Sequence, residues 1–334
     1  MNTRILSLSA LLIVIVSLLS CNKENNTPEQ SSPERIYIGR GPEDILIDEH
    51  NGNPRILASC NERSENRPAF SAIVALDPVT NATRILSRSG EPEGLIFNPH
   101  GFYLQTVGGK KQLYIVNHYR TDDNLSSILV YELKGDELLF RKEYQHALMI
   151  SPNEVCALPD GGFYFTNDMG GDNMIYEQLL NKYGGSLVYC NSQGDCRYAE
   201  EKLAFPNGLE YRDQQLYLAT TRNQALYRYD IQADGSLINK YKLSYINGMD
   251  NLRWNGDRLI VAVHPDEIAF VKHSVDERSH SPSWTYAIDI HTGKEQLLYK
   301  NGGAEISGGS TALVLDGYLY ISQVFGDYLL KVKL

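Results

Sequence analysis

The chain has 334 residues, of which 31 are Lys or Arg and 41 are Asp or Glu, giving a formal net charge of −10. An acidic chain without a basic cluster is a poor candidate for binding nucleic acid. The length allows one large β domain with a substantial hydrophobic core.

The first 20 residues have the pattern of a secretory signal. Arg4 precedes the apolar run 11–16, which is too short to span a membrane. The ending Leu-Leu-Ser-Cys at residues 18–21 resembles the lipobox of bacterial lipoproteins, which implies that Cys21 carries lipid. An ordinary signal peptide with an incidental cysteine is the alternative.

Residues 21–34 are polar and contain prolines, as is typical of a flexible tether. Removal of residues 1–20 takes away one Arg and no acid, so the net charge becomes 30 − 41 = −11. We expect an exported lipoprotein of the cell envelope, at the outer membrane or the cell surface. Its domain, residues 35–334, would be a monomer that meets the membrane only through the lipid.

One three-part pattern occurs six times in this domain. A polar opening leads into a hydrophobic run, and two further runs rich in Leu, Tyr, Ile and Val follow. The steps between successive openings are 56, 53, 54, 44 and 59 residues, counted between the markers Asp44, His100, Asn153, Asn207, Asn251 and Ser310. The alternation and the β-branched and aromatic content predict strands, and no long stretch has a helical period.

Six units of about fifty residues with three or four strands each indicate an all-β, six-bladed β-propeller. The sixth unit ends after its third run, at Leu334. The isolated strand at 35–39 can complete this last blade and so remove an open sheet edge. A sandwich of twelve strands is the alternative.

The five cysteines suggest one disulfide. Cys190 and Cys196 flank the turn "CNSQGDC" and could be joined across a hairpin outside the cytoplasm. Cys60 and Cys156 have no CxxC spacing and are expected to be buried thiols.

In a propeller, the loops that enter the innermost strands gather on one face of the central channel. The six openings would therefore converge, with their carboxylate and amide oxygens and one histidine: Glu43, Asp44, His100, Asn153, Glu154, Asn207, Asp250 and Asn251. Each residue alone has a plainer explanation as a turn or strand-end residue, and Asn207 lies in Pro-Asn-Gly. Their recurrence at one point of each repeat instead favours a hard cation such as Ca²⁺, because a zinc set of His and Cys is absent.

These residues also carry a family resemblance. The segments "GPEDILID", "FNPHGF", "LYIVNH", "FYFTND", "NGLE", "MDNL", "VHP" and "GGSTALVLDGYLYISQVFGDYLLKVKL" resemble, in chain order, the motifs of the paraoxonase/arylesterase family. The resemblance covers about residues 35–334. It implies a six-bladed propeller with two Ca²⁺ ions in its channel that hydrolyses lactones and aryl esters, and a more distant relation to gluconolactonase-like propellers.

The resemblance also assigns residues. Five would hold the catalytic calcium: Glu43, Asn153, Asn207, Asp250 and Asn251. Asp44, Glu154 and the backbone carbonyl of Phe102 would hold a deeper, structural calcium. His100 and His118 match the family's proposed histidine pair, and His264 matches a further histidine of the substrate pocket.

The chain departs from the family pattern in three places. Glu154 stands where the family usually has Asp, so the deeper site has a longer ligand. No cysteine follows Cys196, so the family's disulfide between the terminal strands has no counterpart. Cys21 would replace the retained hydrophobic N-terminus of the vertebrate members.

The expected chemistry is hydrolysis of a small ester or lactone. Ca²⁺ would stabilise the charge that develops on the carbonyl oxygen, and a histidine would deprotonate water. His100 is the first candidate base with His118 as its partner, while Glu43 and Asp250 are alternatives. No G-x-S-x-G elbow supports a serine nucleophile. A sugar lactonase and a non-catalytic ligand-binding propeller are the alternative functions.

Overall fold

A computed structural model describes residues 32–334, except 64–66, 119–125 and 171–182. These residues belong to one compact unit, Ser32–Leu334. The predicted signal peptide, Cys21 and most of the tether lie outside the described residues. No helix in the described ranges has both the length and the apolar character that a membrane crossing requires.

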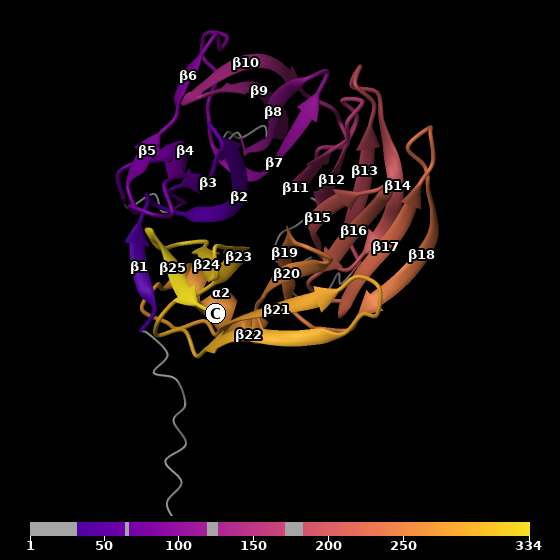
Figure 1. The fold of residues 1–334 in the computed structure, drawn as a ribbon. Helices are drawn as coiled ribbons and strands as arrows, with labels where there is room; N and C mark the ends of the chain where they lie inside the picture. Colours follow the sequence, from indigo (N-terminus) through magenta and orange to yellow (C-terminus); the bar gives the residue numbers. More distant parts are fainter. Residues whose placement is uncertain (1–31, 64–66, 119–125, 171–182) are drawn as a thin grey trace, which may run out of the picture. The chain divides into compact units, whose positions relative to one another are not determined.

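The domain is the predicted six-bladed β-propeller, with six sheets arranged around a common centre (Figure 1). Each innermost strand contacts the innermost strands of the two neighbouring blades, so that the ring is closed. Each of these strands begins within or next to one of the six polar openings. They are β2 (Pro42–His50), β7 (Pro99–Val107), β11 (Pro152–Ala157), β15 (Pro206–Arg212), β19 (Met249–Asn255) and β23 (Gly309–Leu315).

The second and third runs of each repeat form the next two strands of each blade. The second strands are β3 (Asn53–Asn61), β8 (Lys110–His118), β12 (Phe163–Asn167), β16 (Gln215–Thr220), β20 (Arg258–Val263) and β24 (Tyr318–Gln323). The third strands are β4 (Ser71–Leu76), β9 (Ser126–Lys134), β13 (Gly185–Cys190), β17 (Ala225–Ile231), β21 (Ser283–Asp289) and β25 (Tyr328–Lys333).

A fourth strand completes each blade on the outside. Five of these strands follow the third strand in the chain: β5 (Thr83–Ile85), β10 (Glu137–Tyr144), β14 (Cys196–Leu203), β18 (Leu237–Ser244) and β22 (Glu295–Asn301). In the last blade the N-terminal strand β1 (Glu34–Tyr37) pairs antiparallel with β25, as predicted from the unpaired run at 35–39. The two ends of the domain therefore hold each other in one sheet (Figure 1).

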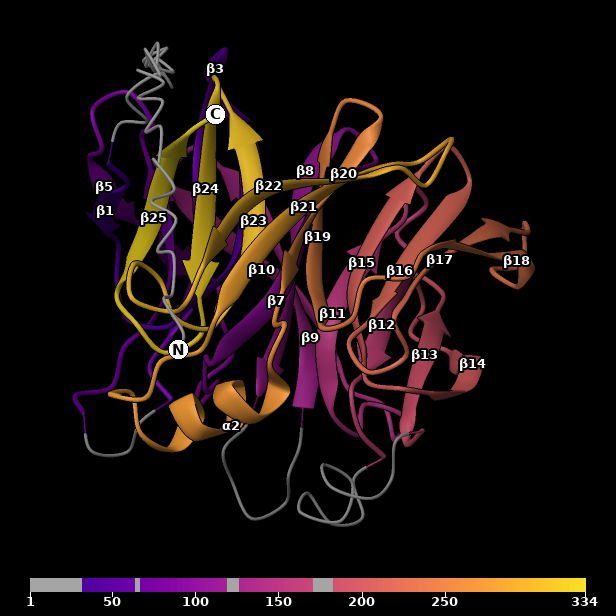
Figure 2. The ribbon, with the colours of Figure 1, turned by 90° about the horizontal axis from the view of Figure 1, so that it is seen from below.

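Two elements of the described residues were not predicted. Strand β6 (Ser87–Ser89) adds a short parallel edge to β10 in the second blade. Helix α2 (Glu267–Val275) lies in the longest step between openings and begins after Asp266, whose carboxylate accepts a hydrogen bond from the backbone N–H of Ala269. It lies beyond one end of the blade strands (Figure 2).

The hydrophobic core is divided into six clusters, one between each pair of adjacent blades. Successive residues of one strand serve different clusters: Ile45 packs toward the last blade, whereas Leu46 packs toward the second. Both faces of every sheet are therefore buried, which explains the long apolar runs of the second strands.

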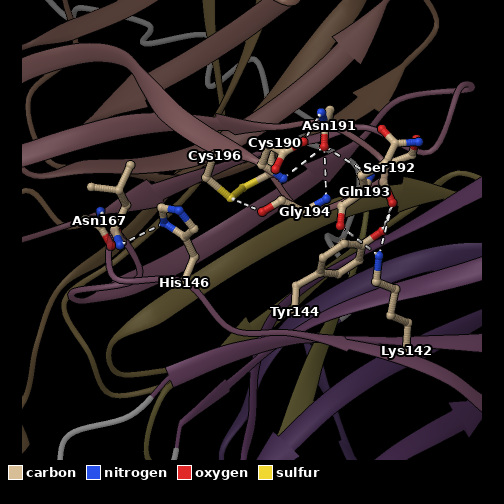
Figure 3. The surroundings of a disulfide bond; sticks show 12 residues. Lys142, Tyr144, His146, Asn167, Cys190, Asn191, Ser192, Gln193, Gly194 and Cys196 are labelled. Atoms are coloured by element: carbon tan, nitrogen blue, oxygen red, sulfur yellow. Dashed lines mark hydrogen bonds between the residues drawn. A yellow bond between two sulfur atoms is a disulfide. The ribbon is translucent and has the colours of Figure 1, made fainter.

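Cys190 and Cys196 are joined by a disulfide across the hairpin of β13 and β14, at the outer edge of the third blade. The turn between them is held to the second blade by Tyr144, whose hydroxyl donates to the Ser192 carbonyl at 2.8 Å (Figure 3). Cys60 and Cys156 are buried free thiols.

Candidate functional site

A one-residue bulge marks the start of every innermost strand. In each of the six strands the register with the next strand shifts by one residue inside the polar opening. Adjacent residues of a regular strand point to opposite faces, and a bulge re-aims the side chains it contains. The bulges lie where the candidate residues are.

Two sets of residues result, which we name by their order in each opening. The first ring comprises Glu43, His100, Asn153, Asn207, Asp250 and Ser310. The second ring comprises the residues that follow them, namely Asp44, Gly101, Glu154, Gly208, Asn251 and Thr311. In the first, third and fifth blades the residue of the second ring is more buried than the residue of the first ring before it, and Asp44 and Glu154 are fully buried.

Side-chain hydroxyls connect the openings of neighbouring blades. Thr166 in the third blade donates to the Asn207 carbonyl at 3.0 Å, and Thr221 in the fourth donates to the Met249 carbonyl at 2.8 Å. In the sixth blade, Ser322 donates to the Glu43 carbonyl at 2.6 Å. The openings therefore converge, as the repeat pattern predicts.

Glycine permits the closest approaches between these openings. A Cβ atom at Gly101 would lie 2.4 Å from the Asn153 carbonyl oxygen, and one at Gly208 would lie 2.7 Å from the Asp250 carbonyl oxygen. Both distances are shorter than a non-bonded contact allows, so these two positions of the second ring are restricted to glycine.

Glu43 and the two predicted histidines meet at the channel mouth. Glu43 Oε2 lies 2.8 Å from His100 Nδ1, and it also pairs with Arg63, whose Nη2 lies 3.0 Å from the same ring nitrogen. The rings of His100 and His118 pack edge to face, with centroids 4.8 Å apart. His118 Nδ1 lies 3.2 Å from the Ser126 hydroxyl.

The charge of Glu43 is strongly stabilised. Burial alone would raise the pKa of its carboxyl, but Arg63 and His100 outweigh burial and lower that pKa to about 2. Glu43 is therefore an anion throughout the neutral range, as both a cation ligand and a partner for a histidine require.

Asp250 and His264 form a second buried acid–histidine pair. Asp250 Oδ2 lies 2.7 Å from His264 Nε2, so the strand after the opening brings His264 back beside Asp250. The His264 ring packs against Phe270 of α2 with centroids 4.3 Å apart and the ring planes tilted by 45°, and Phe270 contacts Phe325. Helix α2 thus supplies an apolar wall beside this pair.

The amides of the openings carry the clearest sign of a missing positive partner. The buried Oδ1 atoms of Asn207 and Asn251 have no hydrogen-bond partner among the described residues. Their Nδ2 atoms are engaged: that of Asn251 donates to Thr311 at 3.0 Å, and that of Asn207 lies 3.5 Å from the Thr221 hydroxyl. A buried oxygen without a partner costs about 1–3 kcal/mol.

Asn153, the remaining member of the predicted set, interacts with Asp168. Burial raises the pKa of Asp168, and hydrogen bonds from Ser151 and Asn153 and the nearby His100 oppose that rise. Asp168 directly follows the run "FYFTN", just as His118 directly follows "LYIVN". Asp168 could therefore have been identified from the sequence as a site candidate, because it occupies the same position in its repeat as His118.

The first predicted cation set fits a hard cation. Two orphaned amide oxygens, two carboxylates and a third amide provide the oxygen ligands that Ca²⁺ takes. Within the described part of the chain, no three His, Cys, Asp or Glu side chains are grouped closely enough to hold a metal by themselves. Any cation here depends on the asparagines.

The second predicted cation set does not fit a cation, because Arg253 lies within it. The guanidinium Nη2 is 2.5 and 2.6 Å from the two carboxylate oxygens of Asp44 and 3.3 Å from the Phe102 carbonyl oxygen. Glu154 Oε1 accepts from the Val155 backbone N–H at 3.0 Å, and Oε2 has no partner among the described residues. Burial raises the pKa of Glu154, with Asp44 adding to the rise and Arg253 opposing it.

Arg253 belongs to a third ring, which we define as the residues three positions after each member of the first ring. These are Leu46, Tyr103, Cys156, Glu210, Arg253 and Leu313. Five of them line a cavity of about 180 Å³ that Trp254, Ile47 and Leu104 complete. Arg253 therefore separates the polar rings from this cavity.

The chain matches known proteins over most of its length. Residues 63–331 match the sequence model of the family described as Arylesterase. The mouse protein "Serum paraoxonase/arylesterase 1" is 26% identical over 245 residues, which cover 69% of this chain and 66% of that protein. The human "Serum paraoxonase/lactonase 3" is 22% identical over 279 residues, or 78% of this chain and 75% of that protein.

A gluconolactonase structure from Xanthomonas campestris shares the propeller fold with a TM-score of 0.51 and 14% identity, over 90% of this chain and 99% of that one. The family match covers well over half of the 334 residues. This chain belongs to the arylesterase family.

Proposed function

We propose that this propeller is a calcium-dependent hydrolase of lactones and aryl esters. The observation that carries the proposal is the pair of buried amide oxygens of Asn207 and Asn251, which have no partner among the described residues and lie in openings that converge with those of Glu43 and His100. The names of two relatives, a paraoxonase/arylesterase and a paraoxonase/lactonase, support the substrate class.

The cation would be held by the predicted set of Glu43, Asn153, Asn207, Asp250 and Asn251. When bound, it would polarise the ester carbonyl and stabilise the negative charge that develops on its oxygen. Each amide oxygen would gain the partner that it lacks in the protein alone.

His100 is the proposed general base. If its Nδ1–H donates to Glu43, the lone pair on Nε2 is available to take a proton from water. Glu43 would favour this tautomer, with the N–H groups of Arg63 directed to the Glu43 carboxylate, and His118, packed against the ring edge, would receive or orient the proton. Glu43 and Asp250 are alternative bases, although the low pKa of Glu43 makes its carboxylate a weak one.

The apolar wall at the mouth suits a substrate with an aryl or alkyl part. Phe270 and Phe325 lie half-buried beside the Asp250–His264 pair. An acyl or aryl group placed against these rings would lie beside the Asp250–His264 pair.

The purified protein should hydrolyse phenyl acetate and an aliphatic lactone, EGTA should abolish the activity, and added Ca²⁺ should restore it.

Asn207→Ala should weaken calcium binding at least tenfold, measured by calorimetric titration. Asn53→Ala, at an exposed position on β3, is the matched control and should bind as the parent does. Unchanged calcium affinity and turnover in Asn207→Ala would refute the site. Calcium binding without turnover on a broad ester and lactone panel would instead indicate a ligand-binding propeller.

We also propose that Cys21 anchors the monomeric domain to the cell envelope, on the strength of the lipobox-like ending at residues 18–21. The parent should fractionate with membranes and incorporate labelled fatty acid, whereas Cys21→Ala should do neither. Equal labelling of the two proteins would contradict the anchor.

A further inference from the structure

We infer that the guanidinium of Arg253 occupies the deeper cation position of the channel, so that this chain holds one calcium ion instead of two. The number of ions rests on the proposed function, because the first ion belongs to it. The occupation of the deeper position by Arg253 does not depend on that function.

All three guanidinium nitrogens of Arg253 are used. Nε donates to the Ile45 carbonyl at 2.7 Å, and Nη1 donates to the Leu252 carbonyl at 2.7 Å. Nη2 reaches Asp44 and the Phe102 carbonyl at the distances given above. The side chain is 7% exposed and so is fixed by its partners inside the protein.

The space that Arg253 fills is the space that a cation would need. Calcium lies 2.3–2.6 Å from its oxygen ligands. Nη2 is already 2.5–2.6 Å from both Asp44 oxygens, and the Phe102 carbonyl, the second expected ligand, points to the same nitrogen. An ion that used these oxygens would overlap the guanidinium.

The charge of Arg253 also serves the role of an ion. Asp44 is fully buried, and a buried carboxylate requires a positive partner or several hydrogen bonds. Arg253 supplies that charge, while Thr311 and the Phe102 backbone N–H donate to the remaining lone pairs at 2.8 and 3.0 Å. Glu210 lies 3.5 Å from Nη1 on the other side of the guanidinium.

The origin of Arg253 in the fold explains how it reaches this position. It lies on β19, three residues after Asp250, and its side chain extends from the third ring to Asp44 of the second ring. The equivalent residues of the blades that hold Asp44 and Phe102 are Leu46 and Tyr103, which carry no positive charge.

The test counts calcium ions per chain in the full-length protein, by calorimetric titration and by metal analysis after dialysis. Arg253→Ala should bind one ion more than the parent, and its unfolding temperature should rise more with added Ca²⁺ than that of the parent. Arg253→Lys, which keeps a positive charge, is the matched control and should bind the same number as the parent. A folded Arg253→Ala protein without an additional ion would overturn the inference.

A second variant keeps the inference testable if Arg253→Ala fails to fold. Glu154→Gln in the otherwise unchanged protein should leave the number of bound ions as it is, since Glu154 holds no ion while Arg253 is present. A parent with two ions, or the loss of an ion in Glu154→Gln, would overturn the inference. Binding of a first ion by the parent tests the proposed function. The difference in the number of bound ions between Arg253→Ala and the parent tests the role of Arg253.

Discussion

Replacing Glu210 by Gln should change how the stability of this protein depends on pH. Burial raises the pKa of Glu210 from 4.5 to about 7, with Asp44 adding to the rise and Arg253 opposing it. Between these two values the native protein holds a proton that the unfolded chain has released. The stability contributed by Glu210 is therefore fully present below pH 4.5 and is lost as the pH rises through about 7.

The size of the effect follows from the shift. One pKa unit corresponds to about 1.4 kcal/mol, so a displacement from 4.5 to about 7 corresponds to about 3 kcal/mol, of which about 2–3 kcal/mol falls between pH 5 and pH 8. Glu210→Gln cannot ionise, so its stability relative to the parent should rise by that amount over this range.

Urea unfolding at fixed ionic strength, with EGTA present throughout, measures both proteins from pH 5 to pH 8. Glu49→Gln, which alters an exposed carboxyl on β2, is the control for charge removal and should run parallel to the parent. Parallel profiles for Glu210→Gln and the parent would show that burial of Glu210 does not govern its ionisation.

Two further changes test the disulfide and the proposed base. Cys196→Ser, which opens a cross-link between residues six apart at its partly exposed end, should lower the free energy of unfolding by about 2 kcal/mol in oxidising buffer and make little difference under a reductant; an equal loss under both conditions would contradict this explanation. His100→Asn should lower kcat/KM by about 100- to 10,000-fold while calcium affinity stays within a few-fold of the parent, measured against the exposed His291→Asn variant. Full activity in His100→Asn would assign the proton transfer to another group.

The blades were predictable because their strands are buried on both faces. A run such as 113–117 is apolar at every position but the last, and this pattern distinguishes it from the polar loops around it. Strand β6 lacks such a run, because its three residues are Ser, Arg and Ser and its pairing with β10 depends on the neighbouring strand. Helix α2 exposes Ile268, Val271 and Val275, so its apolar residues do not follow a buried face.

The convergence of the openings was also predictable, since equivalent points of a repeat meet in a propeller. Arg253 was missed because its partner Asp44 lies 209 residues away in the chain, on the innermost strand of a different blade. No local spacing connects the two. Arg63 was missed for the same reason, because its contact with His100 depends on how the first two blades pack.

The bulges at the start of the innermost strands let the side chains at the channel mouth differ from blade to blade, while the strand pairing of the blades stays the same. In the second to sixth blades the bulge holds two consecutive residues, for example Asn-Gly in the fourth and Ser-Thr in the sixth, whereas in the first blade it holds Glu43 alone and Asp44 already pairs with Ser59. The strand pairs resume in regular register immediately after it. The ligands at the mouth can therefore differ from blade to blade without a change in the strands beneath them, except where a close approach restricts the position to glycine, as at Gly101 and Gly208.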